Sequence, residues 1–202
     1  MKNYSSKLKI WECAALMALS ITLCAGAWAQ AKQTSISAGL IRLHVIAASD
    51  EAREQNIKLK VRDEIIEYLS PILKNAEDSE EARQLIKENA AGIQKAAEKA
   101  ACGREVRLSL GYEAYPTKSY EGFTLPAGSY DSLRVILGPG EGKNWWCIVF
   151  PPLCLEASQA SRVQKVMSRD DYGLISEQEG YELRFKLVEL WGELLNTAKA
   201  MN

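Results

Sequence analysis

The chain has 202 residues, of which 47% are hydrophobic and 25% charged, the composition of a globular protein and not of a disordered one. Its 25 basic and 26 acidic residues leave a net charge of −1 at pH 7, which excludes a nucleic-acid binder that depends on a large positive charge. This length predicts one domain with short appendages.

The N-terminus has the three parts of a secretory signal peptide. Three lysines within the first nine residues precede Ala14–Ala29, which carries no charge, and Ala27-Trp28-Ala29 gives the A-x-A pattern of a cleavage site. These 16 uncharged residues are fewer than the roughly 20 that a membrane-spanning helix needs. We therefore predict a signal peptide over residues 1–29 and export of the rest, with a retained single-span anchor as the alternative.

Export would place the protein in an oxidising compartment. Removing residues 1–29 takes away three lysines and one glutamate, which leaves 22 basic and 25 acidic residues and a net charge of about −3. Cys13 and Cys24 leave with the signal, whereas Cys102, Cys147 and Cys154 remain.

The exported part begins with a polar stretch and a strand. Residues 30–39 are small and polar, which predicts a flexible lead-in to a core domain over residues 40–155. Within Leu40–Ser49, hydrophobic residues alternate with Arg42 and His44, as expected for a strand that buries one face.

Two amphipathic helices follow this strand. Apolar residues recur at helical spacing from Ile57 to Leu73, after a cap at Ser49, and Pro71 should stop or kink this helix. A second helix should start near Asp78 and end before Gly103.

The second half of the core is rich in strands. Residues 105–110, 131–138 and 144–150 each alternate with a period of two, and the Gly-rich link Gly138–Lys143 predicts a hairpin turn. Residues 156–180 are polar and predict an irregular linker, and residues 181–202 predict a C-terminal helix. The order β-α-α-β-β-β-α indicates an α+β fold, with a mainly antiparallel sheet of about four strands and helices packed on it.

Catalytic and metal motifs are weak in this sequence. Gly138–Lys143 departs from a phosphate-binding loop because Asn144 follows the lysine and a strand follows the loop. His44 is the single histidine and lies in the middle of a strand, where a structural role is the plain expectation. We predict no catalytic residue, no metal, no cofactor and no small-molecule substrate.

The stretch Asn144–Cys154, NWWCIVFPPLC, concentrates aromatic side chains and cysteines. Trp145 and Trp146 are neighbours in a strand, so their side chains should lie on opposite faces of the sheet. Cys147 and Cys154 either form a disulfide, if the chain folds back after the two prolines, or stay reduced as small buried side chains.

Several stretches together resemble the stage II sporulation protein R family. They are IRLHVIAASD…KLKVRDEI (Ile41–Ile65), YPTKSY (Tyr115–Tyr120), LPAGSYDSLRVILGPGEGKNWWCIVFPPLC (Leu125–Cys154) and LRFKLVEL (Leu183–Leu190). The family's first strand usually ends in I-A-N-S-D, and here Ala48 replaces the asparagine.

The resemblance implies a signalling protein and not an enzyme. Members are exported from the forespore into the space between the two membranes, where they activate a membrane-embedded aspartic protease that processes the precursor of sigma-E. As contacts with that protease we predict the following residues: Arg42, His44, Asp50, Lys118, Tyr120 and the outward-facing member of Trp145 and Trp146.

Two other functions stay open at this point. A module that binds cell-envelope polymers would stack sugar rings on a row of exposed aromatic side chains. An exported hydrolase would need two carboxylates that face each other across a cleft.

Overall fold

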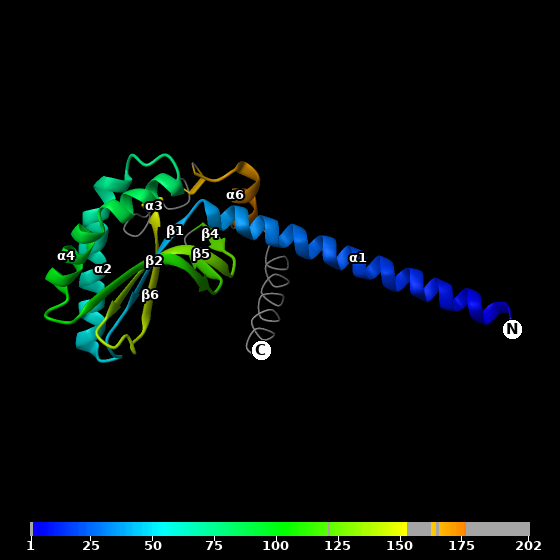
Figure 1. The fold of residues 1–202 in the computed structure, drawn as a ribbon, viewed down its shortest axis with the longest axis horizontal. Coiled ribbons are helices and arrows are strands. Elements are labelled where there is room, and N and C mark those ends of the chain that lie inside the picture. The colour runs from blue at the N-terminus through cyan, green and yellow to red at the C-terminus, as the bar shows by residue number, and fades with distance from the viewer. Residues whose placement is uncertain (1, 121, 153–162, 165, 177–202) are drawn as a thin grey trace.

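The computed structural model describes residues 2–120, 122–152, 163–164 and 166–176, and it consists of one α/β domain with a long N-terminal helix (Figure 1). The helices are α1 (Lys2–Ala38), α2 (Ala52–Leu73), α3 (Ser79–Glu88), α4 (Ala90–Ala100) and α6 (Arg169–Ile175). The strands are β1 (Ile41–Ile46), β2 (Val106–Tyr115), β3 (Lys118–Tyr120), β4 (Phe123–Leu125), β5 (Gly128–Leu137) and β6 (Asn144–Phe150).

The main sheet has four strands in the order β2-β5-β1-β6, and β3 pairs with β4 in a separate two-stranded sheet. β2 pairs with β5, and β1 with β6, in antiparallel register, whereas the central pair β1 and β5 is parallel. The predicted α+β class and the mainly antiparallel sheet are therefore confirmed, with one parallel pair at the centre.

The predicted hairpin at Gly138–Lys143 is wrong. β5 and β6 are not neighbours, because β1 lies between them, so the link crosses the end of β1. The backbone N–H of Gly142 donates to the carbonyl of Ala47 at 2.9 Å, and that of Glu141 donates to Ala48 at 3.3 Å. A local pattern of two strands and a short Gly-rich link cannot reveal a third strand that comes from elsewhere in the chain.

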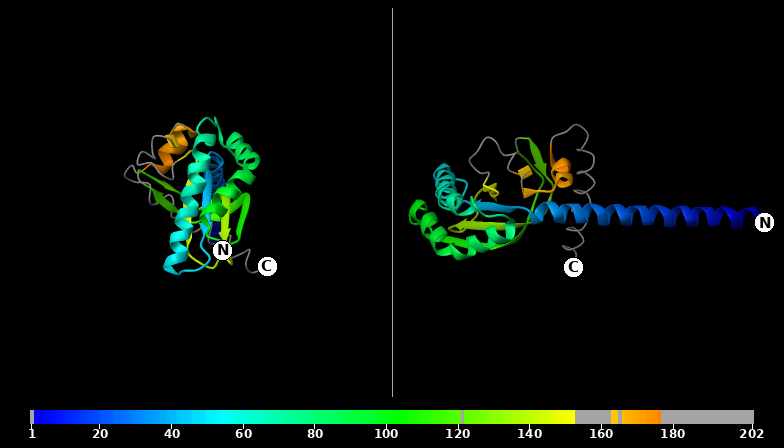
Figure 2. Two further views of the ribbon diagram at one scale, coloured as in Figure 1. Left: turned by 90° about the vertical axis from the view of Figure 1, so that its left-hand side faces the viewer. Right: turned by 90° about the horizontal axis from the view of Figure 1, so that it is seen from above.

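Helices α2, α3 and α4 cover one face of the main sheet (Figure 2). Leu43 and Val45 of β1 point into the core beneath these helices, together with Val61 and Ile65 of α2. The predicted first helix is confirmed except for its cap, because Glu51 and not Ser49 is the N-cap residue. The helix continues past Pro71 to Leu73, since the proline lies in its last turn. The predicted second helix is two helices separated at Asn89.

Two predicted irregular segments are helical instead. Residues 30–38, expected as a flexible lead-in, complete α1, and Ile36 of this last part is buried. Residues 169–175, expected within an irregular linker, form α6, because the Ser168 hydroxyl accepts the N–H of Asp171 and Ile175 is buried. Both corrections have one cause: the apolar residues of these polar stretches pack on the domain.

Most of the remaining C-terminal prediction lies outside the described residues. The C-terminal helix over residues 181–202 and about half of the linker over residues 156–180 therefore stay predictions.

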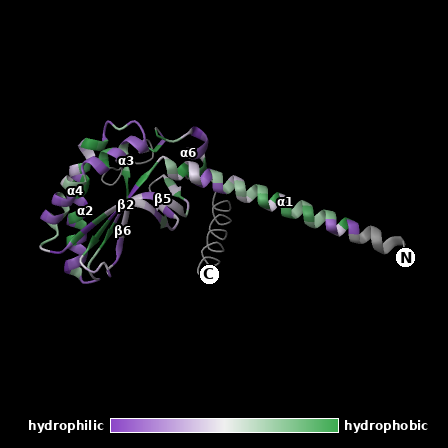
Figure 3. Ribbon diagram, viewed as in Figure 1, coloured by the Kyte–Doolittle hydropathy of each residue, from purple (hydrophilic) through white to green (hydrophobic). Residues whose placement is uncertain are grey.

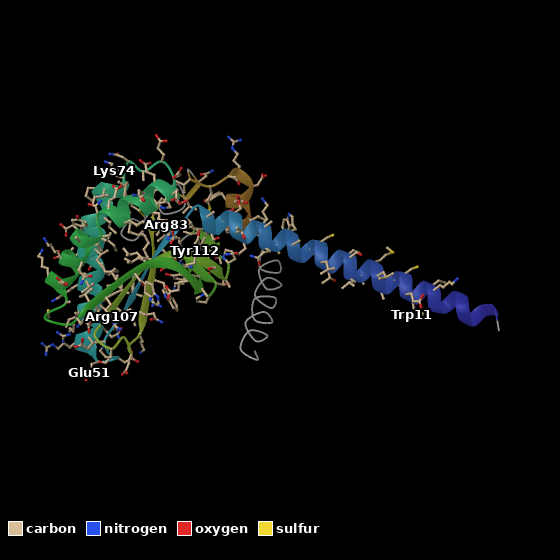
Figure 4. The ribbon with its side chains drawn as sticks, viewed as in Figure 1. Trp11, Glu51, Lys74, Arg83, Arg107 and Tyr112 are labelled. Carbon is tan, nitrogen blue, oxygen red and sulfur yellow. The ribbon has the colours of Figure 1, made fainter. Side chains whose placement is uncertain are left out.

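Helix α1 carries the apolar N-terminal segment (Figure 3). Its part Lys9–Ala38 is long and apolar enough to cross a membrane, with a mean hydropathy of 1.7 over its most apolar window, and a signal sequence passes the same test. Trp11 is exposed along it (Figure 4), and so is Trp28. Cleavage after Ala29 stays a prediction.

Candidate functional site

Strand β1 places two polar side chains, Arg42 and His44, on the face of the main sheet that lies away from α2 and α4, called here the second face. Ile41, Leu43 and Val45 point toward the helices, so Arg42 and His44 point the other way. Both are buried, Arg42 at 0% and His44 at 7% exposure. The alternation in sequence predicted their common face correctly, but not their burial.

Arg42 is enclosed by tyrosines. Its guanidinium carbon lies 3.9 Å from the ring centre of Tyr115 and 5.0 Å from that of Tyr130. Its Nη2 donates to the hydroxyl of Tyr120 at 3.0 Å. The electron-rich ring faces stabilise the positive charge, which has left water.

His44 belongs to a polar network that runs across three strands. Its Nδ1 lies 2.9 Å from Oε1 of Glu113 on β2, and the other oxygen of Glu113 accepts from Ser132 on β5 at 3.1 Å. The hydroxyls of Ser132 and Tyr115 are 2.6 Å apart. Burial raises the pKa of the Tyr115 hydroxyl far above its ordinary value, so that this hydroxyl keeps its proton.

Trp145 and Trp146 lie on opposite faces, as predicted. Trp145 packs on the helical side, where the guanidinium of Arg62 is 4.3 Å from its ring centre. Trp146 lies on the second face with its ring centre 5.7 Å from that of His44. Both are partly exposed. Because Trp146 shares the second face with His44, it is the member that extends the candidate site.

Of the two other predicted contact residues, Asp50 lies apart from this group and Lys118 lies at its border. Asp50 is near the start of α2, where its Oδ1 accepts the backbone N–H of Lys143 at 2.7 Å and so holds the link between β5 and β6. Lys118 is exposed on β3, the same short strand that carries Tyr120. The structure thus brings together Arg42, His44, Tyr120 and Trp146, borders them with Lys118, and separates Asp50 and Trp145.

Sequence reasoning missed the residues of the other strands that lie around Arg42 and His44. These residues are Glu113, Tyr115, Tyr130, Ser132 and Arg134. These residues occupy alternate positions of β2 and of β5, so the sequence indicates that those of one strand share a face. The register that sets Ser132 beside Arg42 is a tertiary fact.

Cys147 is buried on β6 and forms a disulfide, so the reduced alternative does not hold for it. Its predicted partner, Cys154, lies outside the described residues, and the pairing stays a prediction. Cys102 is a free, exposed thiol.

The described surface gives little support to a module that binds envelope polymers. Tyr112 is the exposed large hydrophobic side chain of the described domain, beside Arg83, so these residues offer no row of rings for sugars (Figure 4). Among the described residues no three side chains of His, Cys, Asp or Glu gather as a metal site.

Comparison with known proteins decides the family. The family model described as Stage II sporulation protein R (spore_II_R) matches residues 37–160, which run from the end of α1 through all six strands. The chain belongs to the stage II sporulation protein R family. A curated relative from Bacillus subtilis (strain 168), named stage II sporulation protein R, is 30% identical over 182 residues that cover 77% of this chain and 81% of the relative. No solved structure matches.

Membership of this family assigns the protein a role in sporulation. The matched region includes the whole second-face group and the link Gly138–Lys143.

Proposed function

We propose that this protein is an exported sporulation signal that activates a membrane-embedded aspartic protease, which then processes the precursor of sigma-E. The observation that carries the proposal is the position of the apolar helix. A segment with the properties of an export signal leads directly into the domain that the family model matches. We further propose that the signal acts between the forespore and the mother-cell membranes, without chemistry of its own.

Activation by contact has a thermodynamic requirement. A ligand shifts the protease toward its active state only if it binds that state more tightly than the inactive one. The second face is the part of the domain on which four of the predicted contact residues meet: Arg42, His44, Tyr120 and Trp146. We therefore assign the contact to this face.

The test is processing of the sigma-factor precursor in a host that makes only the protease, the precursor and this protein. We expect the shorter product to appear when this chain is made with its N-terminal helix. Replacement of Leu16 and Leu19 by arginine puts two charges into the apolar segment, and each costs about 3 kcal/mol for membrane insertion. This variant should abolish processing.

The matched control replaces the same two leucines by alanine, which keeps the segment uncharged, and it should retain processing. Fractionation must show both variants at similar levels, with the arginine variant inside the cell. Efficient processing by the cytosolic arginine variant, or no processing by the folded and exported chain, would contradict the proposal.

A further inference from the structure

We propose that the second face binds a carboxylate group of a partner polypeptide at Arg42, and that the side chain of Tyr120 moves aside to admit it. This inference deepens the proposed function, because it names the chemistry of the contact, and it rests on that proposal for the identity of the partner. The binding site itself is argued from the contacts of Arg42.

The guanidinium of Arg42 has donors without acceptors. Its Nε and Nη1 are buried and have no hydrogen-bond partner among the described residues, and Nη2 donates to Tyr120. Because Nε carries one hydrogen and Nη1 carries two, at least three of the five N–H donors are unsatisfied. Buried donors are nearly always paired with an acceptor. We therefore infer that a partner supplies the acceptor for Arg42 when a complex forms.

The charge of Arg42 is also uncompensated among the described residues. The nearby carboxylate Glu113 binds His44 and Ser132 and lies 3.6 Å from Arg134. Asp131, the carboxylate of β5, pairs with Arg83. Stacking on tyrosine rings stabilises the cation but accepts none of its N–H groups.

His44 adds another unsatisfied atom to the same face. Its Nδ1 lies within hydrogen-bond distance of Glu113, and its buried Nε2 has no hydrogen-bond partner among the described residues. His44 lies two residues from Arg42 on the same side of β1, so an acidic side chain that reaches the arginine would pass close to the imidazole.

The entrance to the site is the side chain of Tyr120. This tyrosine is partly exposed, stacks on Phe123 with ring centres 5.1 Å apart, and is held to Arg42 by one hydrogen bond. β3 and β4 form a sheet of their own, so movement of Tyr120 breaks no hydrogen bond of the main sheet. An ionised carboxylate is a stronger acceptor for an arginine than a neutral hydroxyl, and it would replace the hydroxyl at Nη2.

The surroundings favour an acidic segment of protein. Lys118 is exposed two residues before Tyr120, and the side chain of Arg134 is 44% exposed beside Glu113. Two cations at the border of a buried third one attract negative charge. The rings of Tyr115 and Tyr130 lie against the guanidinium, whose N–H groups point outward in its own plane, the direction from which a planar carboxylate binds.

The test is a titration of the full chain in detergent micelles with sodium acetate, followed by NMR of the arginine Nε–H groups. We expect the Arg42 signal to shift and saturate, while sodium chloride at equal ionic strength leaves it in place. Arg107, which is exposed and donates to the carbonyl of Gly138, serves as the internal control and should not saturate.

Two variants make the test specific. Tyr120→Phe removes the competing hydroxyl and keeps the ring, so acetate should bind at least threefold more tightly. Arg42→Lys keeps the charge but loses the paired N–H groups, so saturable binding should be lost. If Arg42→Lys does not fold, the acetate affinity of Tyr120→Phe tests the inference by itself, and an affinity equal to that of the original chain would contradict it.

Three outcomes would overturn the inference. The first is an Arg42 signal that responds to acetate no more than that of Arg107. The second is saturation by inorganic phosphate with no response to acetate. The third is an Arg42 signal that shifts when Glu156, Glu177 and Glu179 are replaced by glutamine, because the chain's own acids would then fill the site. None of these measurements involves the protease. Failure of this inference can therefore be distinguished from failure of the proposed function, which the processing assay tests.

Discussion

At the scale of single residues, Gly142 lies where the link between β5 and β6 passes over the end of β1. A side-chain carbon at this position would overlap the carbonyl oxygen of Ser49 and would lie 2.9 Å from Cβ of Ala47. Because the overlapped atom belongs to the backbone, it cannot turn away as a flexible side chain would. Gly142 is therefore required by close contact between two distant parts of the chain.

Replacement of Gly142 by alanine should lower the free energy of unfolding by about 1–3 kcal/mol, the usual cost of overpacking. Urea unfolding followed by tryptophan fluorescence measures this difference. The matched control is Gly111→Ala in β2, where an added carbon meets nothing within 4 Å and should leave stability equal or slightly raised. Equal losses in the two variants would contradict the packing argument.

At the scale of elements, the end of α1 is joined to α6 through one buried carboxylate. Asp171 accepts from Lys32 at 3.0 Å and from Ser35 at 2.6 Å. Burial alone would raise the pKa of this carboxyl, but hydrogen bonds from Ser35, Lys32 and Ser168, with the charge of Lys32, hold its pKa below the ordinary value of 3.8. Lys32 and Ser35 follow the predicted cleavage site, so the contact would survive removal of residues 1–29.

Replacement of Asp171 by asparagine should lower the free energy of unfolding by about 1–3 kcal/mol at pH 7, since hydrogen bonds to a charged group are lost. A lowered pKa in the folded state contributes stability above the unfolded pKa and loses it as the pH falls through the folded pKa. The difference between the variant and the original chain should therefore shrink below about pH 4.

Urea unfolding at several pH values checks this dependence. The neighbouring exposed acid supplies the control, because Asp170→Asn should change stability little at any pH. A difference for Asp171→Asn that stays constant from pH 7 to pH 3 would mean that the carboxylate charge has no part in the contact.

At the scale of the whole molecule, the domain is held together by one core beneath α2, α3 and α4, by the second face, and by the disulfide of Cys147. A disulfide stabilises mainly by restricting the unfolded chain. If Cys154 is the partner, the closed loop is short, and the stabilisation should be about 2–3 kcal/mol.

Cys147→Ser and Cys154→Ser should then lower stability by the same amount, and the double variant should lower it by no more. Cys102→Ser should have little effect, because that thiol is free and exposed. Urea unfolding and thiol counting by mass spectrometry measure both consequences. A loss for Cys147→Ser without a loss for Cys154→Ser would contradict the pairing of Cys147 with Cys154.

The sequence by itself determined the apolar N-terminal segment, the alternation that sets Arg42 and His44 on one face, the opposite faces of the two tryptophans, and the family. These features depend on the local period of the chain or on contiguous motifs, which every short window of residues carries. Only the tertiary structure decided that β1 lies between β5 and β6, that residues 30–38 continue a helix, and that Arg42 is buried among tyrosines from β2, β3 and β5. These features depend on strand register and packing between segments separated by about 70 residues or more, and no local pattern specifies which distant strand will supply the neighbour.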